Sequence, residues 1–228
     1  MTDKPSIAIT GGASGIGKAI AHILTPDYRI AILDTKQCYS ITGADILSMT
    51  GSVSNQDDVS RFFKEVLMEF GRLDALVTCA GVGFSQPIVD LDVSDWARVI
   101  DVNLTGTFLC CREALRYMIP SGQGRIVTLG SLASMRGFPG QSAYSASKWG
   151  IRGLTEVLAN EVRKDGIQVS CVHPGTVNTE IWDQIMPDAP RGKMLTTEEI
   201  ADIVAFVIRQ PKNVTIESIV VMPASGEF

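Results

Sequence analysis

Short runs of apolar, often β-branched residues alternate with longer amphipathic segments along the whole 228-residue chain. The runs expected to form strands are Ser6–Thr10, Arg29–Asp34, Ile46–Met49, Leu73–Cys79, Arg125–Leu129, Gln168–Val172 and Ser218–Met222. The segments expected to form helices are Gly15–Leu24, Gln56–Phe70, two segments within Val93–Arg116 (the second starting near Asn103), Ser142–Asp165 and Thr197–Ile208. Continuously apolar strands that alternate with helices are typical of a parallel sheet covered on both faces. The pattern predicts an α/β fold: a single doubly wound, Rossmann-type domain over residues 1–228 with about seven strands.

Composition and charge exclude several classes of protein. The net charge is −5 and no cluster of Lys or Arg occurs, which argues against a nucleic-acid partner. No run of 18 apolar residues and no signal-peptide core is present, so we expect no membrane span and a cytoplasmic location. The five cysteines lack a CxxC spacing, which indicates reduced thiols and no metal site.

A glycine-rich turn, Thr10–Gly17, separates the first predicted strand from the first predicted helix. Its glycine spacing differs from G-x-G-x-x-G, but the physical consequence is the same. Glycines allow a tight turn, and backbone N–H groups at the helix N-terminus attract a pyrophosphate. The predicted phosphate-binding residues are Gly11, Ser14, Gly15, Ile16 and Gly17. The alternative is a turn without a ligand.

Asp34 ends the second predicted strand, 23 residues after Gly11. An acid at about 20 residues from the glycine turn is typical of a ribose-binding carboxylate, which repels a 2′-phosphate. We therefore expect NAD rather than NADP. Lys36 is the nearest positive charge and could weaken this preference, and a plain polar strand end is the alternative for Asp34.

Tyr144 and Lys148 are four residues apart in the longest predicted helix and therefore share one face. A tyrosine has an ordinary pKa of ~10, and a fixed ammonium beside it lowers that pKa. The pair can then act as an acid and base near neutral pH. Alone the pattern is weak, because many surface helices carry it by chance.

Several motifs occur together in the order and spacing of one family. They are Thr10–Gly17, Asp34, Asn103, Ser131, Tyr144 with Lys148, and Pro174-Gly175. Taken together they resemble the short-chain dehydrogenase/reductases, and Ser131 lies 13 residues before Tyr144, as the catalytic serine does in that family. The resemblance covers essentially the whole chain.

The resemblance implies an NAD-dependent oxidoreductase that interconverts a secondary alcohol and a ketone. Tyr144 would be the acid and base, and Lys148 would lower its pKa and bind the nicotinamide ribose. Ser131 would polarise the substrate oxygen, and Asn103 would hold a water in a proton relay. The alternatives are an ordinary loop hydroxyl for Ser131 and a helix N-cap for Asn103.

The resemblance also implies the remaining contacts. Further cofactor contacts are expected from Ser52, Val53, Ala80, Gly81, Pro174, Gly175, Val177 and Thr179, besides Asn103, Tyr144 and Lys148. Substrate contacts are expected from Ser131, Tyr144, Phe84, Gln141 and Trp182, the last in a lid between Thr179 and Thr196. Where the family has Asn-Asn-Ala-Gly this chain has Thr78-Cys79-Ala80-Gly81. The short stretch between Asp34 and Ser52 implies a reduced or missing helix.

The expected partner is a small alcohol or ketone. The amphipathic segments 105–118 and 148–162 resemble the family's interface helices, which implies a homotetramer or homodimer. Burial of the same residues within one copy is the alternative. Two other functions remain open: an NADPH-dependent carbonyl reductase, and a non-catalytic, cofactor-sensing protein on the same fold.

Overall fold

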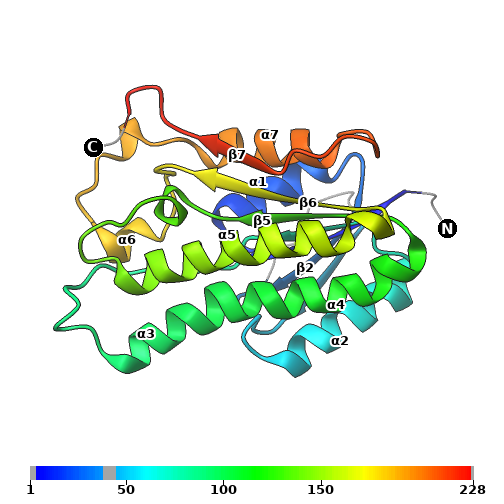
Figure 1. Cartoon of the computed structure of the whole chain (residues 1–228), viewed down its shortest axis with the longest axis horizontal. Coiled ribbons are helices and arrows are strands. Elements are labelled where there is room, and N and C mark those ends of the chain that lie inside the picture. Colours follow the sequence, from blue (N-terminus) through cyan, green and yellow to red (C-terminus); the bar gives the residue numbers. More distant parts are fainter. Residues whose placement is uncertain (1–3, 38–44, 227–228) are drawn as a thin grey trace.

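The computed structural model describes residues 4–37 and 45–226 (Figure 1). Its strands form one parallel sheet in the order β3-β2-β1-β4-β5-β6-β7. The strands are β1 Ser6–Thr10, β2 Arg29–Asp34, β3 Ile46–Thr50, β4 Ala75–Thr78, β5 Gly124–Leu129, β6 Ile167–Pro174 and β7 Ser218–Val221. The α-helices are α1 Gly15–Leu24, α2 Gln56–Phe70, α3 Val93–Val99, α4 Gly106–Ser121, α5 Ser142–Val162, α6 Trp182–Ile185 and α7 Thr197–Ile208. This architecture confirms the predicted doubly wound, Rossmann-type sheet.

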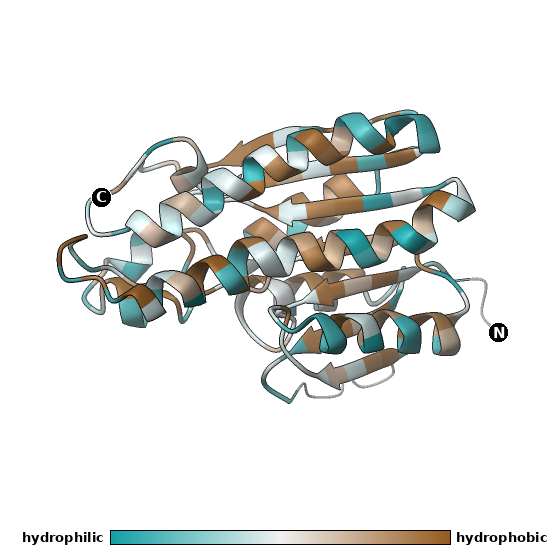
Figure 2. Ribbon diagram, turned by 60° about the horizontal axis from the view of Figure 1, so that its bottom comes forward, coloured by the Kyte–Doolittle hydropathy of each residue, from teal (hydrophilic) through white to brown (hydrophobic). Residues whose placement is uncertain are grey.

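The central strands are buried along their whole length, which explains their continuous apolar sequences. Every residue of β1, β4 and β5 is buried. Ile7 of β1 pairs with Ile30 of β2 on one side and with Ala75 of β4 on the other. Figure 2 shows these strands as mostly hydrophobic and the helices as mixed along their length. A strand that is covered on both faces has no polar side to expose, so it does not alternate.

Helices cover the two faces of the sheet and form two hydrophobic clusters. On one face, α1 and α7 contribute Ile20, Leu24 and Val204 (Figure 1). On the other face, α2, α4 and α5 enclose the edge-to-face pair Phe62 and Phe63, whose ring centroids are 5.3 Å apart. The buried apolar residues of these helices therefore face the sheet.

The limits of α2 illustrate how local chemistry sets the helix boundaries. The Asn55 side chain accepts the backbone N–H groups of Asp57 (2.8 Å) and Asp58 (3.2 Å), which satisfies two donors at the helix start. Gly71 ends the helix with φ of 72°, a left-handed conformation that favours glycine.

The strand order places a switch point between β1 and β4. The chain proceeds from β1 outward to β3 and then returns to β4 on the other side of β1. Loops that leave neighbouring strands at such a point diverge to opposite faces, and ligands bind in the resulting crevice beyond the carboxyl ends. The topology therefore locates the cleft before any side chain is considered.

Two local features add detail to the predicted pattern. The two helical segments expected within Val93–Arg116 are α3 and α4, and a π-helical turn at Ile100–Thr105 joins them into one continuous helical rod. A four-residue helix, α6, lies in the expected lid. The predicted loss of a helix between Asp34 and Ser52 falls on residues 38–44, outside the described residues.

Candidate active site

A cleft of about 920 Å³ opens at the carboxyl ends of β1, β2, β4, β5 and β6. All the residues predicted to contact cofactor or substrate line this cleft except Asn103 and Phe84. Asn103 is fully buried behind the loop that follows β4. The expectation for Phe84 needs correction: its neighbours Gly83 and Ser85 face the cleft, and Phe84 does not.

The glycine turn holds α1 with its N-terminus toward the cleft. Gly11 has φ of 69°, and a Cβ there would lie 2.7 Å from the Cα of Ala80. A Cβ at Gly17 would overlap the carbonyl oxygen of Gly11. The helix begins at Gly15, so the N–H groups of Gly15, Ile16 and Gly17 have no partner within the helix. All three residues line the cleft, and these donors fit a pyrophosphate.

Asp34 lies at the end of β2, where its carboxylate is held by two backbone N–H groups. One oxygen accepts from Ala13 in the glycine turn and the other from Lys36, both at 2.9 Å. The ammonium of Lys36 is 3.0 Å from Glu180 at the start of the lid. The acid thus braces the turn and keeps further lone pairs for a ligand.

Cys79 replaces an amide side chain at the bottom of the cleft. Burial raises the pKa of Cys79 to about 12, and the charge of Lys148 opposes this only in part. Its thiol is therefore neutral at physiological pH. The backbone around it is fixed independently of the side chain, since Cys79 N donates to Thr10 O at 3.1 Å and Ala80 N to Thr10 Oγ1 at 3.3 Å.

Ser52 and Val53 form the wall of the cleft next to β3. The backbone N–H of Ser52 donates to Asp58 in the first turn of α2 at 3.0 Å. The Ser52 hydroxyl is 2.8 Å from that of Ser54. Val53 packs so closely on the helical rod that a Cβ at Gly106 would lie 2.6 Å from its side chain.

Asn103 sits in the π-helical turn, and its amide group is fully engaged. It donates to Val82 O at 2.9 Å and to Ser147 Oγ at 3.0 Å, and it accepts from Val82 N at 2.8 Å. The side chain therefore clamps the loop after β4 to α5 and is not a helix N-cap. Single π turns are frequent at functional sites, where they redirect a side chain. The water relay expected of Asn103 stays a prediction.

Tyr144 and Lys148 lie one turn apart at the start of α5 and face the cleft. The Lys148 side chain is almost completely buried, with its ammonium 5.6 Å from the centre of the Tyr144 ring. The same ammonium donates to Leu129 O at 2.7 Å. A buried ammonium held by a carbonyl is a fixed positive charge beside the phenol.

Ser131 follows β5 and lines the cleft with Tyr144. Its Oγ accepts the backbone N–H of Ala133 at 3.1 Å, in a one-turn 3₁₀ helix at Leu132–Ser134. One lone pair of the hydroxyl is thus engaged while its proton is left to donate. Such a hydroxyl can polarise a carbonyl oxygen.

Two buried residues behind Ser131, Ser134 and His173, were not predicted from sequence to belong to the site. The Ser134 hydroxyl bonds the backbone of Ser131 and is 2.7 Å from Nδ1 of His173. The Ser-x-x-Ser spacing is a capping signal that points to a turn at Ser131. Contact with His173 depends on the tertiary fold and has no local signal.

The lid is organised by Trp182 and Arg191. The indole N–H of Trp182 donates to Val177 O at 2.9 Å, and the residue lines the cleft. The Arg191 guanidinium binds Thr179 O (2.7 Å) and Asp183 (2.6 Å). Arg191 is thus engaged within the lid, and it does not line the cleft.

The described residues contain neither a cluster of metal-ligating side chains nor a membrane-spanning helix. No group of three or more His, Cys, Asp or Glu residues in 4–37 and 45–226 could hold a metal ion. Within the same residues, no helix is long and apolar enough to cross a membrane. Cys79, Cys110, Cys111 and Cys171 are free thiols, and Cys38 lies outside the described residues.

A parallel sheet with a glycine turn, a carboxylate at the end of β2 and a cleft at the switch point defines the Rossmann-type dinucleotide-binding class. Residues 5–190 match the family described as short chain dehydrogenase. The chain belongs to the short-chain dehydrogenase/reductase family. It is an NAD(P)-dependent oxidoreductase that acts on CH–OH groups and carbonyls of small substrates.

Similar proteins cover nearly the whole chain. It is 34% identical over 215 residues to a 3-oxoacyl-[acyl-carrier-protein] reductase of Homo sapiens, covering 90% of this chain and 91% of that protein. It is 34% identical over 224 residues to the 2-dehydro-3-deoxy-L-rhamnonate dehydrogenase (NAD(+)) of Sphingomonas sp. (strain SKA58), covering 92% and 90%. The structure of ElxO with NADP bound matches with a TM-score of 0.84 and 28% identity, covering 95% and 96%.

Proposed function

We propose that this protein is an NAD-dependent oxidoreductase that interconverts a secondary alcohol and a ketone. The proposal is carried by the buried ammonium of Lys148, 5.6 Å from the Tyr144 ring centre at the reaction end of the cleft. Ser131 lies in the same cleft and presents a hydroxyl proton. Tyr144 with Lys148 would provide the acid and base, and Ser131 would donate a hydrogen bond to the substrate oxygen on which charge develops.

NAD would be held along the cleft by this chain's own groups. The N–H groups at the start of α1 would bind the pyrophosphate, Asp34 the adenosine ribose, and Lys148 the nicotinamide ribose. When bound, NAD supplies the hydride chemistry. The expected contacts of Val177 and Thr179 lie on the segment that leads into the lid.

The chain's residues would then manage the proton and the oxygen. During reduction the Tyr144 hydroxyl gives its proton to the substrate oxygen, and during oxidation it takes that proton back. The Lys148 charge stabilises the phenolate left behind. Ser131 holds the oxygen by a hydrogen bond that strengthens as negative charge develops. Gln141 and the apolar face of Trp182 would contact the rest of the substrate.

The preference for NAD rests on Asp34. A carboxylate there accepts hydrogen bonds from ribose hydroxyls and repels a 2′-phosphate. Lys36, the neighbouring cation, forms an ion pair with Glu180 at 3.0 Å, and its charge also interacts with that of Asp34. Similar proteins are known with each cofactor: the Sphingomonas enzyme is named for NAD(+), and ElxO was solved with NADP.

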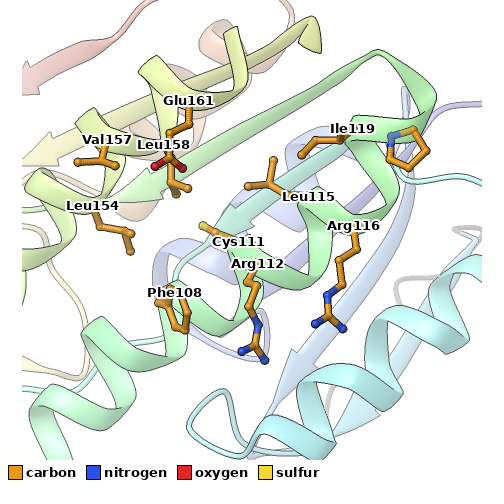
Figure 3. A pocket seen from close by; sticks show the side chains of 11 residues that line it. Phe108, Cys111, Arg112, Leu115, Arg116, Ile119, Leu154, Val157, Leu158 and Glu161 are labelled. Carbon is orange, nitrogen blue, oxygen red and sulfur yellow. The ribbon is translucent and has the colours of Figure 1, made fainter. Parts of the chain in front are cut away.

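We also propose that the protein self-associates through α4 and α5. The two helices line a groove of about 560 Å³. Figure 3 shows the apolar side chains around it. Val157 is 53% exposed there and Phe108 42% exposed. Arg112 and Arg116 line the α4 side and Glu161 the α5 side, so a two-fold axis would pair opposite charges between copies. The charge pattern favours a second copy over burial within one chain.

Fluorescence titration with NADH and NADPH tests the cofactor preference. We expect NADH to bind at least about tenfold more tightly, a difference of about 1.4 kcal/mol. Asp34→Asn removes the negative charge and one of the two acceptors for the Ala13 and Lys36 N–H groups, and it should narrow this ratio. Asp57→Asn, in the first turn of α2, should leave the ratio unchanged. Equal or tighter binding of NADPH by the wild type would overturn the preference for NAD.

A further inference from the structure

A chain of hydrogen bonds runs from β6 to the serine that faces the substrate. Nδ1 of His173 is 2.7 Å from the Ser134 hydroxyl. That hydroxyl donates to the carbonyl oxygen of Ser131 and lies 3.4 Å from the Ser131 backbone N–H. His173 and Ser134 are both completely inaccessible to solvent. The backbone of Ser131 is therefore held on both of its polar groups by one buried hydroxyl.

The single proton of the Ser134 hydroxyl determines which ring nitrogen of His173 is protonated. The Ser134 hydroxyl has one proton, which goes to Ser131 O, so His173 Nδ1 must be the donor in their contact. Nε2 of the neutral ring then carries a lone pair, and it has no hydrogen-bond partner among the described residues. A charged ring would leave a buried N–H unpaired. Burial lowers the pKa of His173, and a hydrogen bond with the Ser131 backbone opposes this in part.

The contact needs a glycine at the end of β5. A Cβ at Gly130 would lie 2.5 Å from His173 Nδ1 and 3.0 Å from Cys171 Sγ. Gly130 is itself tied to β6, because its N–H donates to Val172 O at 2.8 Å. The histidine thus reaches under the strand end that carries Ser131, directly before the Pro174-Gly175 segment that lines the cleft.

The hydrogen bonds of Ser134 affect the Ser131 hydroxyl, which is the group that the proposed reaction uses. Ser131 is extended, with φ of −172°, and its Oγ accepts Ala133 N–H only while the 3₁₀ turn is intact. That turn is closed by Ser134, whose backbone N–H donates to Ser131 O at 2.9 Å and whose hydroxyl bonds both polar backbone groups of Ser131. If Ser134 moves, the Ser131 hydroxyl loses the bond that directs its proton toward the cleft.

We propose that His173 and Ser134 are positioning residues, which hold the Ser131 hydroxyl in the orientation needed to donate to the substrate oxygen. The proposal rests on the function proposed above for Ser131. Neither residue touches the substrate or the reacting atoms; both act through Ser131. Their removal should therefore affect turnover and leave the cofactor affinity unchanged.

Steady-state ketone reduction by the full-length enzyme with saturating NADH tests this assignment. We expect Ser134→Ala to lower kcat about 10- to 100-fold, the loss typical of a misplaced reacting group, with NADH affinity unchanged. His173→Leu should act in the same way. His173→Asn should restore most of the activity, because its amide N–H can replace Nδ1. Ser170→Ala is the matched control: Ser170 is equally buried on β6, and its hydroxyl has no hydrogen-bond partner in the part of the chain that the structure describes.

A double-mutant cycle separates positioning from a general structural role. In a Ser131→Ala background, Ser134→Ala should lower kcat no further, since the hydroxyl that it orients is already gone. An equal loss in both backgrounds, or full activity of Ser134→Ala, would overturn the proposal. If Ser134→Ala does not fold, the two histidine variants provide the test. A kcat of His173→Asn no higher than that of His173→Leu would then overturn the proposal. A wild type that binds NADH but reduces no ketone would instead contradict the proposed function, on which the proposal depends.

Discussion

At Gly83 the backbone lies against the ring that carries the proposed proton transfer. A Cβ there would lie 2.9 Å from Cδ2 of Tyr144 and 3.2 Å from Cδ1 of Ile181. The glycine is therefore needed for space between the tyrosine and the lid, and its φ lies outside the left-handed region. One missing methyl group lets the loop after β4, α5 and the lid meet at the tyrosine.

Gly83→Ala should displace the tyrosine ring without breaking the fold. We expect kcat to fall about 10- to 100-fold while NADH still binds, because a small shift of a reacting group is enough to slow proton transfer. Steady-state kinetics and cofactor titration measure the two effects. Gly153→Ala is the control: an added Cβ there meets nothing within 4 Å, so activity should persist and stability should rise by about 0.5–1 kcal/mol. Unchanged kcat in Gly83→Ala would contradict the steric argument.

At the scale of elements, the central strands β1, β4 and β5 were predictable from sequence because burial on both faces gives them largely apolar runs, whereas the edge strands β3 and β7 are partly exposed. The third strand was expected at Ile46–Met49 and is found at Ile46–Thr50. The π turn was not predictable, since the clamp formed by Asn103 joins Val82, 21 residues away. The short helix α6 has too few residues for a periodic pattern.

The candidate site also contains residues that the sequence could predict and residues that it could not. Gly11, Asp34 and Tyr144 could be placed from their spacing, because each follows a strand or shares a helix face. The link between Ser134 and His173 spans 39 residues and arises only when β5 and β6 pair. Phe84 was misplaced because an irregular loop has no period that tells which side chains face inward.

The lid depends on Arg191, which joins its two ends. Arg191→Ala removes bonds to Thr179 O and Asp183 from a side chain that is 27% exposed. We expect a loss of about 1 kcal/mol in lid closure, which raises the substrate KM about fivefold and leaves NADH affinity almost unchanged. Arg163→Ala, which breaks an exposed ion pair with Glu217 and does not line the cleft, should leave KM unchanged. The same KM in both variants would show that Arg191 does not order the lid.

At the scale of the whole molecule, the sheet places the proposed cofactor contacts at the carboxyl ends of its strands, and the outer faces of α4 and α5 form the groove. The groove lies behind the helices that carry Asn103, Tyr144 and Lys148. A second copy on this face would brace the same helices from outside. Assembly and activity should therefore be linked.

Val157→Arg should prevent the proposed association. The residue is 53% exposed, so the change leaves the core of one copy intact, but it places a cation among Arg112 and Arg116 of the second copy. Light scattering during gel filtration should show a smaller species than the wild type. Met68→Arg, at a site that is 78% exposed on α2, should keep the wild-type mass. An unchanged mass for Val157→Arg would exclude this interface.

The central claim is that Tyr144 exchanges a proton with the substrate oxygen beside a bound nicotinamide. The most direct test is single-turnover oxidation of bound NADH by a ketone that the wild type reduces, compared between the wild type and Tyr144→Phe. We expect the variant to bind NADH with unchanged affinity and to lose at least about 100-fold in the rate of absorbance change, because only the proton donor is removed. A rate near that of the wild type would contradict the account.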